Sequence, residues 1–111
     1  MKNISSSELY DLYNDTISKC GSFLLNESNE VVIYNIFEEF DIGVISFFHE
    51  ESLKKLFDGG YISAYKMEKS LELRSLVLEI QNSDDWNIES FRASEKWKKV
   101  LDISDQLAKM S

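Results

Sequence analysis

The sequence predicts an all-α fold, a single-domain bundle of five or six helices that takes in residues 1–111. Apolar residues recur mostly at the helical spacings of three and four rather than at the alternating spacing of strands. The chain contains no proline, and three of its four glycines stand where helices are expected to end. Hydrophobic residues make up 43% of the chain, which is ample for the core of one domain of this length.

The first helix is expected to begin after Ser5 and to end at Gly21. Ser5 and Glu8 have the spacing of a capping box, in which each side chain accepts a hydrogen bond from the other residue's backbone N–H. One helical face then carries the apolar residues Leu9, Leu12, Tyr13, Ile17 and Cys20. On that face, Cys20 is expected to be a small buried hydrophobe rather than a reactive thiol.

The second and third helices are expected over residues 28–40 and 42–57. The β-branched run 31–33 also fits a strand, but the apolar spacing that follows is helical, so we predict a helix. The residues expected to face inward are Ile33, Ile36, Phe37 and Phe40 on the second helix, and Ile45, Phe48, Ser52 and Leu56 on the third. His49 falls on the same inward side and is expected to be a core histidine bonded to backbone or hydroxyl groups.

A fourth helix, expected over residues 63–81 and capped by Ser63, is predicted to be the central one. Its later part is apolar on nearly every side, which is typical of a helix surrounded by others: Leu71, Leu73, Leu76, Val77, Leu78 and Ile80. After a turn, the last segment is expected to break within 90–94 into a short helix and a long one. Ile88 and Phe91 predict this break, because they do not continue the apolar face of the residues after them.

The net charge of −8 lies entirely in the first half of the chain. Residues 1–53 contain ten acids and two bases, whereas residues 54–111 contain ten of each. No Lys or Arg stands between Lys19 and Lys54, a stretch that holds seven acids. Negative charge of this size repels nucleic acid and anionic lipid surfaces and attracts basic proteins. Since no signal peptide or membrane-spanning run is visible, the sequence predicts a cytoplasmic protein with neither a membrane nor a nucleic-acid partner.

Motifs for catalysis, metals and cofactors are broken or missing in the sequence. His49 opens a run like that of zinc proteases, but no second histidine follows four residues later. Alternating polar residues from Asp85 have the start of a calcium loop, but Ser90 and Lys96 stand where glycine and glutamate are required. With one cysteine and no glycine-rich phosphate loop, we expect no enzyme activity, no metal, no cofactor and no small-molecule substrate.

Acidic and aromatic residues share the outward sides of the second and third helices. Four of them, at spacings of 0, 4, 8 and 11, share one side of the second helix, and Phe47 lies opposite the apolar face of the third. Exposed aromatics anchor protein interfaces, and carboxylates steer a basic partner into place. The alternatives are that Phe47 packs beneath another helix and that the charge serves only solubility. The candidate partner-binding residues are Glu30, Tyr34, Glu38, Asp41, Phe47, Glu50 and Glu51.

A small, acidic, helical chain with such a surface and no catalytic motif resembles the immunity proteins of bacterial nuclease toxins, of the colicin kind and of contact-dependent growth inhibition systems. The resemblance covers the whole chain in size and character and rests on no diagnostic motif, so it transfers no residue role. It implies a protein that binds a basic toxin domain, across or beside its active site, and blocks it. The alternatives are a helical adaptor or regulator that binds another protein, and an enzyme of unrecognised type.

Overall fold

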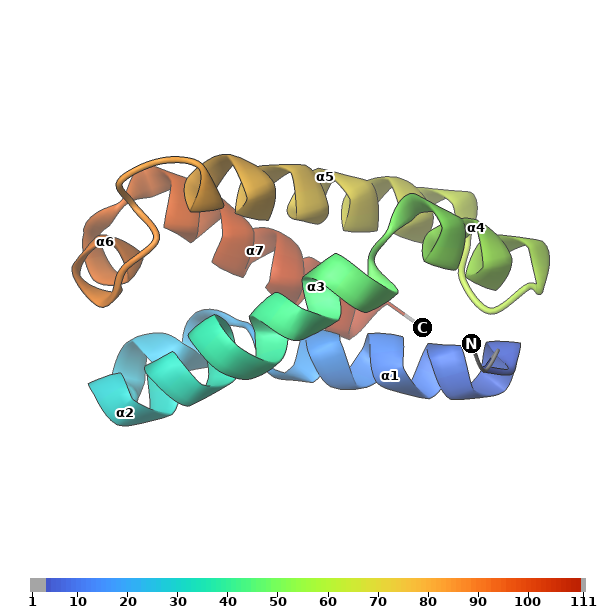
Figure 1. Cartoon of the computed structure of the whole chain (residues 1–111), viewed down its shortest axis with the longest axis horizontal. Helices are drawn as coiled ribbons and strands as arrows, with labels where there is room; N and C mark the ends of the chain where they lie inside the picture. Colours follow the sequence, from blue (N-terminus) through green and yellow to red (C-terminus); the bar gives the residue numbers. More distant parts are fainter. Residues whose placement is uncertain (1–3, 111) are drawn as a thin grey trace.

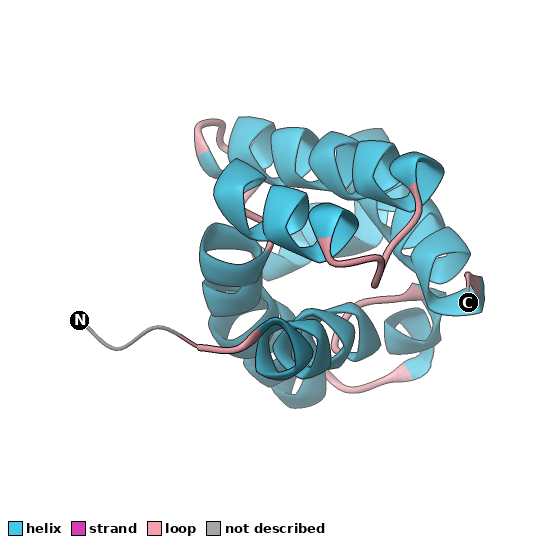
Figure 2. Cartoon of the chain, turned by 90° about the vertical axis from the view of Figure 1, so that its right-hand side faces the viewer, coloured by secondary structure: helices cyan, strands magenta, loops and turns pink. Residues whose placement is uncertain are grey.

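Helices make up all of the regular secondary structure in residues 4–110, the part of the chain that the computed structural model describes (Figure 2). The predicted all-α class is therefore confirmed. In chain order, the elements are α1 (Ser6–Ser18), the 3-10 helix η1 (Ser22–Asn26), α2 (Asn29–Val32), the π-helix η2 (Ile33–Phe40), α3 (Asp41–Phe47), α4 (Glu50–Asp58), α5 (Ala64–Gln81), α6 (Ile88–Ala93) and α7 (Glu95–Lys109).

The helices enclose one hydrophobic core. Figure 1 shows α5 and α7 on one side of it and α1 and α2 on the other, with α3 crossing in front of α1. The largest side chains buried between them are Tyr13, Phe40, Phe48, Phe91 and Trp97. None of the helices in residues 4–110 is both long enough and apolar enough to cross a membrane.

The first helix, α1, begins where it is predicted to begin and ends earlier. Ser5 Oγ accepts a hydrogen bond from the Glu8 N–H at 3.1 Å, and Glu8 Oε1 accepts one from the Ser5 N–H at 3.2 Å, which confirms the capping box. The helix ends at Ser18 rather than at Gly21, because the chain turns there into η1. A Cβ on Gly21 would lie 2.8 Å from Asp105 Oδ1, so this glycine serves a close approach to α7 instead of ending the helix.

The second and third predicted helices are divided at a different place from the predicted one. α2, η2 and α3 form one unbroken run over residues 29–47, since the residues at both junctions keep helical backbone angles. The break follows Phe48, and His49 is extended and caps α4. His49 is exposed, and its Nδ1 accepts a hydrogen bond from the Glu51 N–H at 3.3 Å. The prediction of a core histidine is wrong, because the break turns this position towards solvent.

Burial along the run 29–47 repeats every four residues. The fully buried side chains of the run, and of the residue after it, are Val32, Ile36, Phe40, Val44 and Phe48. In an ordinary α-helix such a row drifts by about 40° at each step, because four residues exceed one turn of 3.6. The backbone of the π-helical part, η2, turns through a smaller angle per residue, so four residues make less than one full turn. The drift of the row within η2 is therefore opposite to the drift within the α-helical parts. The two compensate, and the buried row stays on one side of the run.

This winding corrects two of the predicted inward positions. A period of 3.6 residues places Ile33 and Ile45 inward, but their side chains are 41% and 53% exposed. Each lies one residue after a member of the buried row, and so it flanks the core instead of entering it. The inward residues that are fully buried as predicted are Ile36, Phe40, Phe48 and Leu56.

The long helix α5 begins at the predicted cap, where Ser63 Oγ accepts a hydrogen bond from the Lys66 N–H at 3.1 Å. One side of α5 enters the core through Leu73, Val77 and Ile80. Three further leucines are half-buried: Leu71, Leu76 and Leu78. The helix therefore contributes to the core without being enclosed on every side, and Figure 1 shows it along one edge of the bundle, packed on α7.

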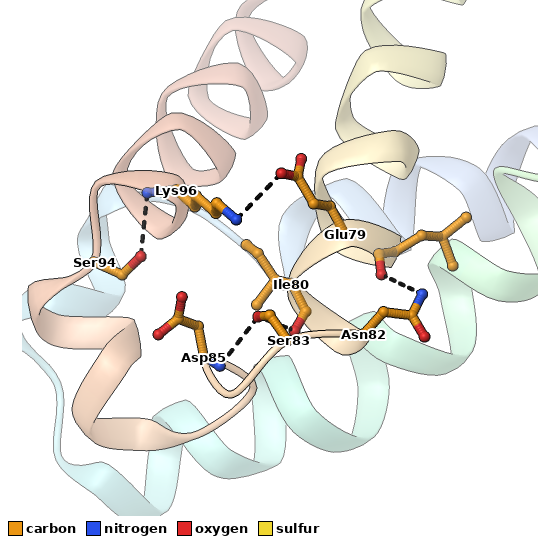
Figure 3. A network of polar contacts seen from close by, with 8 residues as sticks. Glu79, Ile80, Asn82, Ser83, Asp85, Ser94 and Lys96 are labelled. Carbon is orange, nitrogen blue, oxygen red and sulfur yellow. Dashed lines mark hydrogen bonds and ion pairs between the residues drawn. The ribbon is translucent and has the colours of Figure 1, made fainter.

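Polar contacts join the end of α5 to the last two helices (Figure 3). Lys96 Nζ of α7 pairs with Glu79 Oε1 of α5 at 3.2 Å. In the turn between them, the Asp85 N–H donates to Ser83 Oγ at 3.1 Å. The predicted break into a short and a long helix is confirmed, since α6 ends before Ser94, whose Oγ caps α7.

Gly43 lies where α3 crosses α1. A Cβ at this position would overlap Thr16 Oγ1 and would lie 2.8 Å from Thr16 Cβ. The two helices approach this closely because Gly43 has no side chain.

Gly43→Ala is therefore expected to lower the free energy of unfolding by about 1–3 kcal/mol, the usual cost of overpacking. Without a clash, replacing glycine by alanine within a helix raises stability by up to about 1 kcal/mol. A net loss of stability is therefore evidence of the clash with Thr16. Urea unfolding followed by circular dichroism measures it. Ser46→Ala, at an exposed position of the same helix, is the matched control and is expected to leave stability unchanged or slightly higher. A Gly43→Ala variant that is more stable than wild type by the full helix-propensity gain of about 1 kcal/mol would show that the helices do not touch here.

Candidate partner-binding surface

Three of the seven predicted surface residues lie in one exposed row. The side of the run 29–47 that points away from the core carries a residue at every fourth position, and all five are exposed: Glu30, Tyr34, Glu38, Ile42 and Ser46. We refer to these five residues as the outward row. It lies opposite the buried row that begins at Val32, because the two are offset by half of the four-residue repeat.

The other four predicted residues lie elsewhere. Asp41 is one residue off the outward row and is half-buried. Phe47 is half-buried against the core, so the alternative that it packs beneath other helices describes its position. Glu50 and Glu51 are exposed in the first turn of α4. They lie beyond the far end of a helical run that is roughly 25 Å long. Only Glu30, Tyr34 and Glu38 of the seven therefore share the outward row.

Tyr34 is held in the outward row by a hydrogen bond along the π-helix. Its hydroxyl donates to Glu39 Oε1 at 2.8 Å, across the five-residue interval of π-helical hydrogen bonding. This hydrogen bond, with the negative charges of Glu39, Glu38 and Asp15, raises the pKa of Tyr34. The hydroxyl is therefore protonated at neutral pH, and Tyr34 as a whole is 51% exposed.

Exposed apolar side chains lie next to the outward row: Val31, Ile33 and Ile45 are each one residue away from one of its members, and we refer to these three as its apolar border. Ten large hydrophobic side chains are exposed in residues 4–110, and seven of them lie within residues 23–45: Phe23, Leu25, Val31, Ile33, Tyr34, Ile42 and Ile45. Sequence reasoning missed Ile42 and assigned Ile33 and Ile45 to the core, because it applied a period of 3.6 residues. A test for a period of four would have found the outward row, since the buried row repeats at that interval.

The acidic side chains of residues 20–53 take part in none of the salt bridges of the described chain. All five salt bridges in the described part of the chain join residues outside 20–53. Arg92 of α6 lies at the edge of this region and donates hydrogen bonds to oxygens of Leu25, Glu27 and Asn29. These bonds hold the connection between η1 and α2 against α6. The carboxylates of Glu30 and Glu38 in the outward row therefore face water and take part in none of the salt bridges of residues 4–110.

The single thiol of the chain is not arranged for catalysis. Cys20 is buried, as predicted, and accepts a hydrogen bond from Ser104 Oγ at 3.2 Å. Burial raises the pKa of Cys20 to about 12, so the thiol is protonated at neutral pH and is a poor nucleophile. Within residues 4–110, no group of three or more His, Cys, Asp or Glu side chains is placed to hold a metal ion.

Asp41 connects α3 to the end of α5. Its Oδ1 accepts a hydrogen bond from Gln81 Nε2. Partial burial raises the pKa of Asp41 above its usual value of 3.8, and the bond from Gln81 acts in the opposite direction. Because burial is the larger cause, the folded protein holds the Asp41 proton more tightly than the unfolded chain does.

The variant Asp41→Asn is expected to gain stability over wild type as the pH rises. The raised pKa in the folded state means that the charged carboxylate disfavours folding, and this cost is absent below pH 3.8 and appears as the group ionises above it. Asparagine can accept the same bond from Gln81 without carrying charge. Urea unfolding of both proteins from acidic to neutral pH measures the difference. A difference that shrinks or reverses towards neutral pH would contradict the prediction.

Comparisons with known proteins give no match that would name a relative. No family model matches the chain, and neither a curated protein nor a solved structure does.

Proposed function

We propose that this protein binds a basic toxin domain through the outward row and its apolar border, and neutralises it as an immunity protein does. One observation carries the proposal: acids without ion-pair partners and exposed apolar side chains coincide on one helical run. A surface that serves only solubility needs the acids but not the apolar side chains.

The two kinds of side chain have different roles in such an interface. Ile42 and the ring of Tyr34 lose water-exposed area on binding, which supplies affinity. The carboxylates of Glu30 and Glu38 attract a cationic partner over a distance and raise the association rate. The expected partner surface therefore has an apolar centre with Lys or Arg around it.

A nuclease toxin offers such a surface, because a groove that binds nucleic acid carries cations for the phosphates. Carboxylates of the outward row can pair with the same cations. Occupation of the groove, or of the surface beside it, then keeps the nucleic acid out. A fast, charge-steered association suits this role, since the toxin must be captured before it acts.

Charge reversal on the outward row tests the proposal. The chain is co-expressed with a basic toxin domain encoded next to its own gene, and both the affinity and the growth of the producing cells are measured. Glu30→Lys combined with Glu38→Lys is expected to weaken binding by about tenfold or more, mainly through the association rate, and to remove the protection of growth. Added salt is expected to slow association of the wild type. Ile42→Ala is expected to cost about 1 kcal/mol of binding or more through lost contact area.

The matched control reverses two exposed acids of the charge-balanced half. Glu68→Lys on α5 combined with Glu89→Lys on α6 changes the net charge by the same amount. This double variant is expected to bind and to protect like wild type. If it abolished binding while the variant of the outward row bound normally, the partner would dock on the C-terminal helices. Binding without protection of growth would favour an adaptor over an immunity protein.

A further inference from the structure

Lys66 is a buried lysine without a carboxylate partner. It lies in the first turn of α5 and is 2% exposed. Its Nζ lies over the ring of Tyr13, 5.5 Å from the ring centroid, and 3.5 Å from the carbonyl oxygen of Met110. None of the salt bridges in residues 4–110 includes Lys66.

These contacts replace only part of the hydration that the ammonium group loses. An ammonium group has three N–H donors, and the one hydrogen bond to Met110 is at the upper limit of length. The contact with the Tyr13 ring stabilises the charge without accepting a conventional hydrogen bond. Two donors of a buried cation are left without an acceptor in the described chain, and such a cation favours an anion beside it.

A cavity of about 210 Å³ adjoins Lys66. The volume equals the share of about seven water molecules in the liquid, which is room for a small organic molecule. Its polar lining comes from α1, and its apolar lining from α1 and the end of α7: Asn14, Ser18, Ile17, Leu107 and Met110. The cavity therefore combines a buried positive charge with an apolar wall.

The lysine supplies the net charge of this cavity. The first turn of α5 carries the positive partial charge of a helix N-terminus, and the last turn of α7 carries the negative partial charge of a C-terminus. The two partial charges have opposite signs and largely cancel. Among the residues that line the cavity, the Lys66 ammonium is therefore the group that favours a negatively charged ligand.

We propose that this cavity binds a small organic carboxylate of a few carbon atoms. The carboxylate accepts hydrogen bonds from the two unused donors of Lys66, and its apolar part lies against Ile17 and Leu107. An inorganic anion would satisfy the lysine but would leave the apolar wall uncovered. The proposal does not depend on the partner-binding surface, because none of the residues that line the cavity belongs to the outward row.

Titration of the full chain with sodium butanoate tests the proposal, with sodium chloride used to keep the ionic strength constant. Saturable shifts of the Ile17 and Leu107 methyl signals in NMR spectra are expected, together with a rise in Tm. Lys66→Met keeps the length of the side chain and removes its charge. It is expected to bind butanoate about 10- to 100-fold more weakly, as for the loss of a charged hydrogen bond. Lys69→Met, one turn further along α5, is the matched control and is expected to bind like wild type.

A second variant keeps the lysine and fills the space. Ala108 is exposed and lines the cavity from α7, so Ala108→Leu narrows it while retaining a good helix former. This variant is expected to lose butanoate binding with its fold intact, and it tests the cavity even if Lys66→Met does not fold. Absence of saturable shifts in wild type, or equal affinities of wild type and Lys66→Met, would overturn the proposal. Inorganic phosphate binding as tightly as butanoate would overturn the role of the apolar wall.

Discussion

The straight row of buried side chains along residues 29–47 is the constraint on which the rest of this structure depends. Because the row keeps one direction, a single long helix lies against the core over its whole length instead of winding away from it. α1 meets this helix at Gly43, and the ring of Trp97 meets it at Phe37, with centroids 5.8 Å apart. The π-helical winding of η2 keeps the row straight, so a local feature of the backbone determines which helices can pack here and where.

The same winding creates the surface that we assign to a partner. When the buried row is straight, the row opposite it is straight as well, and Glu30, Tyr34, Glu38 and Ile42 come into line on the solvent side. Acids placed close together repel one another, and a surface shaped for stability alone interleaves both signs of charge. The second half of the chain does interleave them and contains most of the observed salt bridges. This contrast within one small domain is the physical reason for our proposal that the acidic half recognises a partner.

A charged group removed from water lies at each end of α5: the buried Lys66 at its start and the half-buried Asp41 of α3 at its end. Lys66 lies in its first turn and contacts the end of α7, whereas Gln81 lies in its last turn and donates to Asp41 of α3. Each contact connects α5 to a different part of the bundle at the cost of removing a charged group from water. The two sites differ in how far hydrogen bonds replace the lost hydration. Asp41 has a direct hydrogen-bond donor, whereas Lys66 has one long hydrogen bond beside a cavity.

The sequence by itself determined the helical class, the starts of α1 and α5, the break before α7 and the uneven distribution of charge. Those features follow from local chemistry: a serine cap such as Ser5 or Ser63 acts within one helical turn, and charge is a matter of composition. Only the tertiary structure decided that residues 29–47 form one helix, that His49 is a cap and that Ile45 faces solvent. These outcomes depend on the π-helical winding, which a helical period of 3.6 residues does not anticipate, and on the contact of Gly43 with α1, which joins segments that are distant in the chain.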